Sequence, residues 1–555
     1  MATTVVAPQV TRVSRDRGPI VTALVMAGLI AAAAASLAWV GDDALITLRT
    51  ALNAAHGWGW GFNATEAVQG YTHPLWFGLW LLAGSATGNW LGTAMVMGVV
   101  ATAAAVLLAL APGRSGPRIV LIGGLLLLSN AFVEYATSGL ENPLGYLLFA
   151  ALIAVSSADR RAVAAAALTG LLVAALVLTR MDYVLLFLPA AALWTWQRRD
   201  NVRALVAAAG AALLPVGLWF GWAYVTYGYV LPATYEAKTN LAIPRGQLIE
   251  TGWYYLSFSL RHDPATVVML AVGAVLLLRW GTAMQRSWLV GIALYLAYVV
   301  WIGGDFMIGR FVAVPVLICA ALCARVDLPD RIGRVIDGPP VAGTGSRALA
   351  YLTAVVAVMA VAIVGVLLGS PATTLARPTT QRWEPMEIVL SDERGVYAVK
   401  YGGVGDYLRN LGKARASDGA AGQSVFADDS REPLELINTP LWQIERAADQ
   451  WPDNPGPAAL PERVVSACGG LGVIAVMNGP RVHVVDECAL TDRFLAALPG
   501  GDPDMVALPG HMRRQVPEGY LDAVRRGDAG LVLDPAQSAR LTAVWDRIRS
   551  QIPVS

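Results

Sequence analysis

The chain changes from apolar to charged at Gly41-Asp42-Asp43-Ala44-Leu45-Ile46-Thr47-Leu48-Arg49. The apolar run directly before it, residues 20–40, is long enough to cross a bilayer as a helix. Two adjacent carboxylates are costly at the point where a membrane helix meets water, unless they have a use there. This stretch therefore predicts a membrane protein with a polar site at one membrane surface.

The composition agrees with a multi-spanning membrane protein that carries a soluble part. Of 555 residues, 56% are hydrophobic and 15% are charged, and the mean hydropathy is +0.52. A net charge of +1 and the absence of a basic tract disfavour a nucleic-acid partner. Arg12, Arg15 and Arg17 precede the first apolar run, whose length favours an uncleaved span over a signal peptide.

Ten further apolar runs follow the first. They cover residues 90–111, 119–133, 143–157, 162–179, 183–197, 204–225, 264–279, 287–303, 310–324 and 348–369. We expect about eleven spans, with the short segment 74–83 lying at the interface or re-entering the membrane. With a cytoplasmic N-terminus, this count places arginines in every cytoplasmic loop, as the positive-inside rule requires.

The composition changes again after about residue 370, where proline, glycine and charged residues return. We expect two domains: a transmembrane catalytic domain over 1–370 and an extracytoplasmic α/β domain over 371–555. Within the second, residues 473–477 and 482–485 are expected to be strands joined by a turn, and 433–448 and 536–551 helices.

The four cysteines fall into two pairs. Cys319 and Cys323 lie in an apolar run and are expected to be inert packing residues. Cys468 and Cys488 lie in the extracytoplasmic part, where a disulfide is favoured and would contribute about 3 kcal/mol. Two buried free thiols are the alternative.

The acidic pair suits catalysis, although one Asp could simply cap the helix that follows. The second Asp adds like-charge repulsion, which raises one pKa and suits a general base. No cofactor is firmly implied; a single divalent cation (Mg²⁺, Mn²⁺ or Ca²⁺) held by Asp42 or Asp43 is an alternative. A zinc site is not expected, because the five histidines form no His/Cys cluster. Arg49 either points back toward the same pocket or anchors a lipid headgroup.

Further polar residues are expected on the same membrane surface. They are His73, Glu141, Arg180, Asp182, Asp305 and Arg310. Helix capping is an alternative explanation for Glu141, and a local ion pair for Arg180 with Asp182.

The loop Tyr227–Lys238 also belongs to this surface. Tyr227, Tyr235, Glu236 and Lys238 supply stacking faces, hydroxyl donors and a cation, which suit binding of a sugar and a phosphate. An aromatic belt at the interface would explain the tyrosines but not Glu236 and Lys238.

The location limits the substrate. Nucleotide sugars and ATP are absent outside the membrane, and no phosphate-binding glycine motif follows a strand. A sugar donor there must be carried on a lipid phosphate. Arginine and lysine would then neutralise the leaving phosphate, while a carboxylate takes the proton of the acceptor hydroxyl.

These residues resemble the GT-C superfamily of polyprenyl-phosphate-dependent glycosyltransferases over about residues 20–325. The resemblance is carried by the acidic pair, Tyr71-Thr72-His73-Pro74-Leu75-Trp76, Ser138-Gly139-Leu140-Glu141, Leu178-Thr179-Arg180 and the 227–238 loop. Gly41–Thr50 and Gly303-Gly304-Asp305-Phe306-Met307 are most similar to the actinobacterial (mycobacterial) terminal β-arabinofuranosyltransferases of cell-wall arabinan. In the tail the resemblance rests on short pieces, such as Gly510-His511.

The resemblance implies a plasma-membrane enzyme of cell-wall biogenesis that transfers arabinofuranose from decaprenyl phosphate to an arabinan-like glycan. It implies an inverting single displacement with Asp42 or Asp43 as the base. Arg49, Arg180, Lys238 and Arg310 would lie near the donor phosphate. The pattern at residues 70–74 departs from that of the mycobacterial enzymes, so the acceptor stays open.

Three alternatives remain. The donor could be polyprenyl-phosphate mannose, or the acceptor a protein such as pilin. A lipid-linked-sugar transporter is disfavoured, because its ionisable residues should lie at mid-span rather than at one membrane face. A binding module on a membrane anchor would not need eleven spans.

Overall fold

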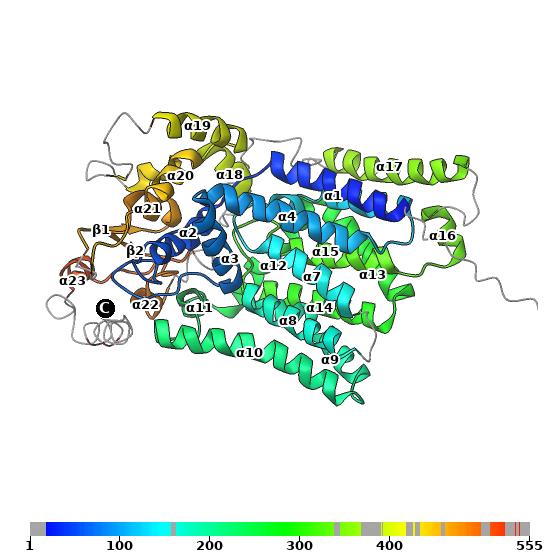
Figure 1. The fold of residues 1–555 in the computed structure, drawn as a ribbon, viewed down its shortest axis with the longest axis horizontal. Helices are drawn as coiled ribbons and strands as arrows, with labels where there is room; N and C mark the ends of the chain where they lie inside the picture. The colour runs from blue at the N-terminus through cyan, green and yellow to red at the C-terminus, as the bar shows by residue number, and fades with distance from the viewer. Residues whose placement is uncertain are drawn as a thin grey trace, which may run out of the picture.

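The computed structural model describes residues 18–156, 162–337, 344–367, 390, 392–417, 426–427, 433–456, 461–500, 511–527, 539 and 543. It is mostly helical, and the C-terminal elements gather at one end of the helical bundle (Figure 1).

The first part contains α1 (Gly18–Ser36), α2 (Asp42–Ala55), α3 (Pro74–Thr87), α4 (Trp90–Leu110), α5 (Gly116–Leu128), α6 (Asn130–Glu134), α7 (Asn142–Ser156), α8 (Val163–Thr179), η1 (Met181–Tyr183), α9 (Val184–Gln197), α10 (Val202–Tyr227), α11 (Ala233–Thr239), α12 (Arg245–Arg261), α13 (Pro264–Trp280), α14 (Ala283–Trp301), α15 (Ala313–Arg325), α16 (Asp330–Ile336) and α17 (Thr344–Leu367). The second part contains α18 (Glu393–Lys400), α19 (Val404–Ser417), η3 (Pro433–Asn438), α20 (Leu441–Asp449), β1 (Arg463–Ala467), α21 (Leu471–Asn478), β2 (Val482–Asp486), α22 (Arg493–Ala496) and α23 (Tyr520–Arg526).

The apolar helices identify a membrane protein. Within the described residues, α1, α4, α10 and α14 are each long and apolar enough to span a bilayer, and α12 with α13, bent by 100°, forms a fifth candidate. Shorter apolar helices are α5, α7, α8, α15 and residues 348–363 of α17. Each of the eleven predicted runs contains a helix, but the number of crossings stays a prediction.

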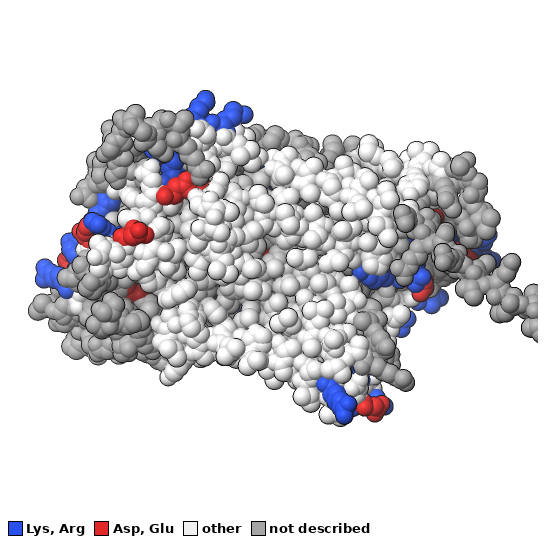
Figure 2. Space-filling model, viewed as in Figure 1, with Lys and Arg blue, Asp and Glu red and all other residues white. Residues whose placement is uncertain are grey.

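The distribution of charge agrees with a membrane belt. On the face shown in Figure 2, Lys, Arg, Asp and Glu gather toward the two ends of the molecule and leave a bare band between them. Large apolar side chains are exposed along the helices of this band, among them Leu213 and Leu218 of α10 and Val100 of α4. Such exposure is expected where lipid is the solvent.

The helix α3, which covers the short segment 74–83, has 14 residues. Pro74 begins it, as is common at a first helical position. Trp76 and Trp80 are buried, and their indole N–H groups donate to the carbonyls of Gly139 and Trp90, at 2.8 Å each. At about 1.5 Å per residue, α3 alone is too short to cross a bilayer about 30 Å thick.

The predicted strand at 473–477 is wrong, because these residues belong to α21. All eight residues of α21 are buried, so its sequence is apolar on every side and shows no periodicity that could separate helix from strand. The strand that pairs with β2 is β1, in parallel register from Arg463–Val482 to Ala467–Asp486. Parallel neighbours need a crossover connection, and α21 is that connection.

Two further expectations concern the tail. The segment 433–448 is helical, as η3 followed by α20. The segment 536–551 lies outside the described residues except at positions 539 and 543.

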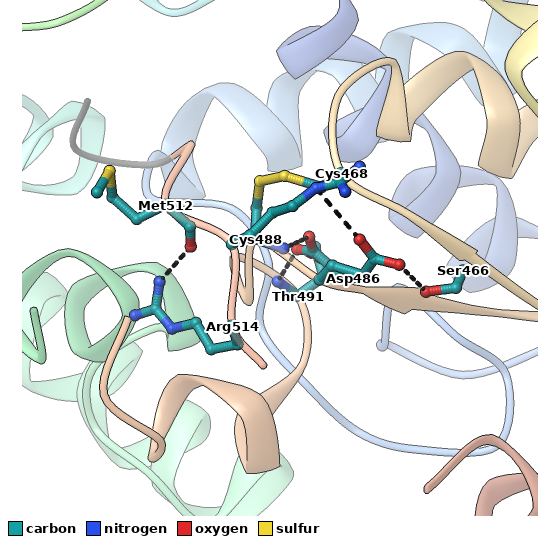
Figure 3. Close-up of a disulfide and its surroundings, with 9 residues drawn as sticks. Ser466, Cys468, Asp486, Cys488, Thr491, Met512 and Arg514 are labelled. Carbon is teal, nitrogen blue, oxygen red and sulfur yellow. Dashed lines mark hydrogen bonds and ion pairs between the residues drawn. A yellow bond between two sulfur atoms is a disulfide. The ribbon is translucent and has the colours of Figure 1, made fainter. Parts of the chain in front are cut away.

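Cys468 and Cys488 form a disulfide that joins the residue after β1 to the turn after β2 (Figure 3). The carboxylate of Asp486 orders this turn by accepting from the backbone N–H groups of Cys488 and Thr491, at 2.9 and 2.8 Å. Cys319 and Cys323 are free and buried.

The C-terminal part is docked on α2 through α21. Asp42 accepts from the backbone N–H groups of Gly472 (3.1 Å) and Val473 (2.8 Å) at the start of α21. The two backbones approach so closely that a Cβ at Gly472 would lie 2.2 Å from the carbonyl oxygen of Asp42. A side chain at position 472 is therefore incompatible with this packing.

Candidate functional site

Charged side chains from four separate places along the chain meet at one end of the membrane bundle. Asp43 comes from the first turn of α2, Glu141 from the turn before α7, Arg180 from the end of α8, and Asp305 and Arg310 from the turn between α14 and α15. We call these five residues the charged cluster.

Arg310 is the centre of the charged cluster. Its Nη1 lies 3.3 Å from Asp305 Oδ2 and 3.7 Å from Asp43 Oδ2, and its Nη2 lies 3.4 Å from Glu141 Oε1. Its side chain is 8% exposed. One guanidinium thus faces three carboxylates, which is the fork geometry that arginine offers and lysine does not.

Glu141 is fully buried and supports the two arginines. Its Oε1 accepts from Arg180 at 2.7 Å, and its Oε2 lies 3.2 Å from Nδ1 of the buried His73. Burial alone would raise the pKa of Glu141, but Arg310, His73 and Arg180 outweigh it and hold that pKa below its usual range. Glu141 is therefore ionised and positions the cations.

His73 joins the charged cluster to α2. Its Nε2 lies 2.9 Å from the Thr47 hydroxyl, and burial lowers the pKa of His73 to about 4. The imidazole is therefore neutral near pH 7 and makes contacts through both ring nitrogens. Because His73 and Glu141 are buried, the structure places both predicted substrate-binding residues behind the arginines.

Arg180 and Asp182 form the local pair expected from the sequence. The guanidinium donates to both carboxylate oxygens of Asp182, at 2.9 and 2.7 Å. It also lies over the ring of Phe311, 5.0 Å from its centroid. Arg180 is thus paired with Asp182 and Glu141. The Arg and Lys side chains whose charges act on Asp43 are Arg310 and Lys238.

The four residues of the 227–238 loop separate into different environments. Tyr227 is buried and its hydroxyl contacts Tyr71 Oη (2.9 Å) and the carbonyl of Trp60 (3.1 Å). Tyr235 is 53% exposed, and Glu236 pairs with Arg493 at 3.3 Å.

Lys238 lies on α11 and remains exposed. Although the side chain reaches solvent, desolvation by the surrounding protein lowers the pKa of Lys238, and the negative charges of Asp305 and Asp43 oppose this effect. Lys238 is therefore part of the surroundings of the charged cluster, on its open side.

The two adjacent aspartates have different partners. Asp42 is 6% exposed and uses both of its carboxylate oxygens to cap α21. Asp43 keeps 29% of its side chain exposed and faces Arg310. Burial raises the pKa of Asp43; Arg310 opposes this and Asp305 adds to it. Asp43 is thus the member of the pair that a substrate can reach.

Arg49 is not brought to the charged cluster. It is fully buried and donates to the carbonyls of Phe62 (2.7 Å), Val482 (2.7 Å) and Ala475. These bonds tie α2 to α21 and β2, so Arg49 reaches neither a donor phosphate nor a lipid headgroup.

A divalent cation held by Asp42 or Asp43 stays a prediction. The oxygens of Asp42 already accept two backbone bonds, and Asp43 is beside a guanidinium. In the part of the chain that the structure describes, no three His, Cys, Asp or Glu side chains are grouped as metal ligands.

The C-terminal part contributes a residue that sequence analysis did not single out as a site residue, His511. Its ring packs against Phe306, with centroids 4.1 Å apart. Burial lowers its pKa, and the charges of Asp43, Asp305 and Lys238 act on it. The next residues hold His511 in place, because Arg514 donates to the carbonyls of Ala237 and Met512, at 2.6 and 2.7 Å. No local pattern identifies such a residue, since the contact spans more than two hundred positions.

A small apolar cavity of about 10 Å³ lies beside the charged cluster. Its walls include Thr72 and Pro74, which flank His73, and Met181, which lies between Arg180 and Asp182. Leu178 and Phe220 complete this side of it.

No protein-family model matches the sequence, and no curated protein matches it. Among solved structures, the chain is similar to the arabinosyltransferase EmbB from Mycobacterium smegmatis, with 14% identity and a TM-score of 0.38. The match covers 79% of this chain and 47% of that chain, so this chain spans about half the length of EmbB. At this identity and TM-score the similarity says nothing about substrate.

Proposed function

We propose that this membrane protein is a GT-C-type glycosyltransferase that moves a sugar from a polyprenyl phosphate to a glycan acceptor. The observation that carries the proposal is the surroundings of Asp43. A partly exposed carboxylate stands beside Arg310 and near Lys238 at one end of a membrane bundle. A carboxylate beside two cations suits a general base next to a phosphate, and the end of a membrane bundle is where a lipid phosphate is expected.

The residues have separate roles in a single displacement. Asp43 takes the proton of the acceptor hydroxyl as that oxygen attacks the anomeric carbon of the donor. The bond between the anomeric carbon and the phosphate oxygen breaks, and the polyprenyl phosphate leaves with the bonding electrons. Arg310 and Lys238 stabilise the charge that develops on the phosphate. Attack from the face opposite the leaving group inverts the anomeric configuration.

The buried residues of the site hold the partly exposed ones in position. Glu141 and Asp305 hold Arg310 between them, and His73 contacts Glu141 from behind. The sugar is taken to be arabinofuranose on the sequence resemblance, with an arabinan-like acceptor and an extracytoplasmic site at the plasma membrane.

The first test is transfer by purified protein in detergent, with synthetic polyprenyl-phosphate arabinose and an arabinan oligosaccharide. We expect Asp43→Asn to lower kcat by about 10²- to 10⁴-fold, the usual contribution of a general base. Donor binding should persist in Asp43→Asn. Asp42→Asn is the matched control and should retain transfer, because Asp42 contacts α21.

The remaining outcomes are distinguishable. Donor binding without transfer by the wild type points to another acceptor. If the protein binds polyprenyl-phosphate mannose but not polyprenyl-phosphate arabinose, the donor sugar is mannose. Equal activity of Asp43→Asn and the wild type would rule out Asp43 as the base.

A further inference from the structure

An apolar cavity of about 290 Å³ lies between α7, α8, α9, α10 and α14. Its walls include Leu152, Val173, Phe187, Ala212 and Trp288. It is distinct from the cavity beside the charged cluster. Arg180 follows the last residue of α8, whereas this cavity is lined by Thr169 and Gly170 in the first half of α8. The larger cavity therefore lies farther along α8 from Arg180 than the smaller one does.

The cavity exists because α10 packs on one side only. Figure 1 shows α10 along the edge of the bundle beside α8, and its strongest packing is against α8. Only 6% of the most apolar stretch of α10 is buried within the protein. The opposite wall of the cavity comes from α9 and α14, which pack against each other. The space between these walls faces the lipid.

An apolar space of this size is not expected to stay empty in a bilayer. A cavity of about 150 Å³ in a soluble protein already binds a benzene-sized ligand, and lipid chains surround this one. An acyl chain would fill the space between α9 and α10 without a desolvation cost, because the chain comes from an apolar medium.

The mouth of the cavity carries positive charge. Arg198 contacts two residues of the cavity wall, Trp194 and Ser156. Its guanidinium carbon lies 4.2 Å from the ring centroid of Trp194, and its Nη2 lies 3.5 Å from the carbonyl oxygen of Ser156. Arg199 and Arg203 are exposed nearby, as is Asp200. Among the described residues at this turn between α9 and α10, three positive charges stand against one negative charge, which favours an anionic headgroup.

A second apolar cavity provides a contrast. It lies between α5, α13, α15, α16 and α17 and has a volume of about 160 Å³. Its wall residue Arg118 already binds both carboxylate oxygens of Asp337. That cation is neutralised within the protein, in contrast to the exposed Arg199 and Arg203 beside the first cavity.

We propose that the cavity between α9 and α10 holds one acyl chain of an anionic phospholipid, with its phosphate at Arg199 and Arg203. The site is separate from the charged cluster, and the proposal is independent of the glycosyltransferase function. It makes the phospholipid a structural partner that holds α10 against the bundle.

The test compares two neighbouring positions on α10. Ala212→Phe fills the cavity, whereas Leu213→Phe changes the next residue, which is 70% exposed and outside the cavity wall. Full-length protein is reconstituted with phosphatidylglycerol or phosphatidylcholine, extracted in detergent, and its retained phospholipid is counted by native mass spectrometry. We expect retained phosphatidylglycerol with the wild type and with Leu213→Phe, and about tenfold weaker retention with Ala212→Phe, as for the loss of about two buried methylene groups.

Two further variants complete the test. Ala191→Leu, a smaller change on the opposite wall, should also weaken retention if Ala212→Phe fails to fold. Arg199→Gln with Arg203→Gln should abolish the preference for phosphatidylglycerol. Unchanged retention in the filling variants, equal retention of phosphatidylcholine by the wild type, or a polyprenyl lipid as the retained species would each overturn the proposal.

Discussion

Neighbouring residues with the same side chain do different things in this protein. Asp42 and Asp43 are adjacent on α2, yet Asp42 caps a helix of the C-terminal part and Asp43 faces Arg310. A helix turns by about 100° per residue, so adjacent side chains point to different neighbours. The identity of the base therefore depends on which element packs against each face of α2.

Asp42 should couple stability to pH. Burial raises the pKa of Asp42 from 3.8 to about 6, although the bonds from Val473 and Gly472 oppose this rise. The folded state therefore binds the Asp42 proton more tightly than the unfolded state does. This proton stabilises the fold fully below pH 3.8, and the stabilisation is lost as pH rises through about 6. Two pKa units correspond to about 3 kcal/mol.

Asp42→Asn cannot titrate, so its unfolding midpoint relative to the wild type should rise between about pH 4 and pH 7. Thermal unfolding in detergent at both pH values measures this difference. Asp406→Asn, at an exposed carboxylate of α19, is the control. A constant difference between Asp42→Asn and the wild type would contradict the coupling.

His511 should contribute to transfer although it lies in the C-terminal part. It packs on Phe306 and is near Asp43, so a substrate at Asp43 should contact it. We expect His511→Gln to lower kcat/KM for the acceptor by about 5- to 100-fold, the range for losing one hydrogen bond in a site. Donor binding should be unchanged. His56→Gln, whose imidazole pairs with Asp453, is the control and should transfer normally.

At the scale of elements, the contact between α2 and α21 joins the two parts of the chain. Asp42 and Arg49 both reach across it, and Asn63 adds bonds with the backbone of Val484. Glu445 of α20 accepts from the backbone of Trp90 and Leu91 at the start of α4. So many buried bonds favour a fixed platform over a lid that opens and closes.

Arg49→Lys should destabilise this contact. Lysine cannot reproduce the three bonds to Phe62, Ala475 and Val482, and a buried charge without its partners costs about 3–5 kcal/mol. The unfolding midpoint should fall, and protease should cleave the C-terminal part faster. Arg409→Lys, at an exposed arginine of α19, should leave both measurements unchanged. Wild-type stability of Arg49→Lys would show that the contact is not needed.

At the scale of the whole molecule, the bundle has two different ends. The charged cluster and the C-terminal part lie at one end, and the turn between α9 and α10 with the start of α10, which carry Arg198, Arg199 and Arg203, lie at the other (Figure 1). By the positive-inside rule, we expect the arginine-rich end to face the cytoplasm.

This orientation predicts the labelling of single cysteines. Thr239→Cys, on the exposed end of α11, should react with a membrane-impermeant maleimide on intact cells. Asp200→Cys, between α9 and α10, should react only after the cells are permeabilised. The wild type is the blank, because its cysteines are either disulfide-bonded or buried. Labelling of position 200 on intact cells would reverse the assignment.

The sequence by itself determined the membrane helices and most members of the charged cluster. Apolar runs are long, local signals, and charges at their ends are conspicuous because they are costly there. Tertiary structure decided the rest. Residues 471–478 form a helix that the sequence did not predict, because a segment buried on all sides shows no periodicity. Tertiary structure also removed Arg49 from the cluster, placed Asp42 against α21 and brought His511 to Phe306. These contacts join residues hundreds of positions apart, and no local pattern records which partner a side chain will meet.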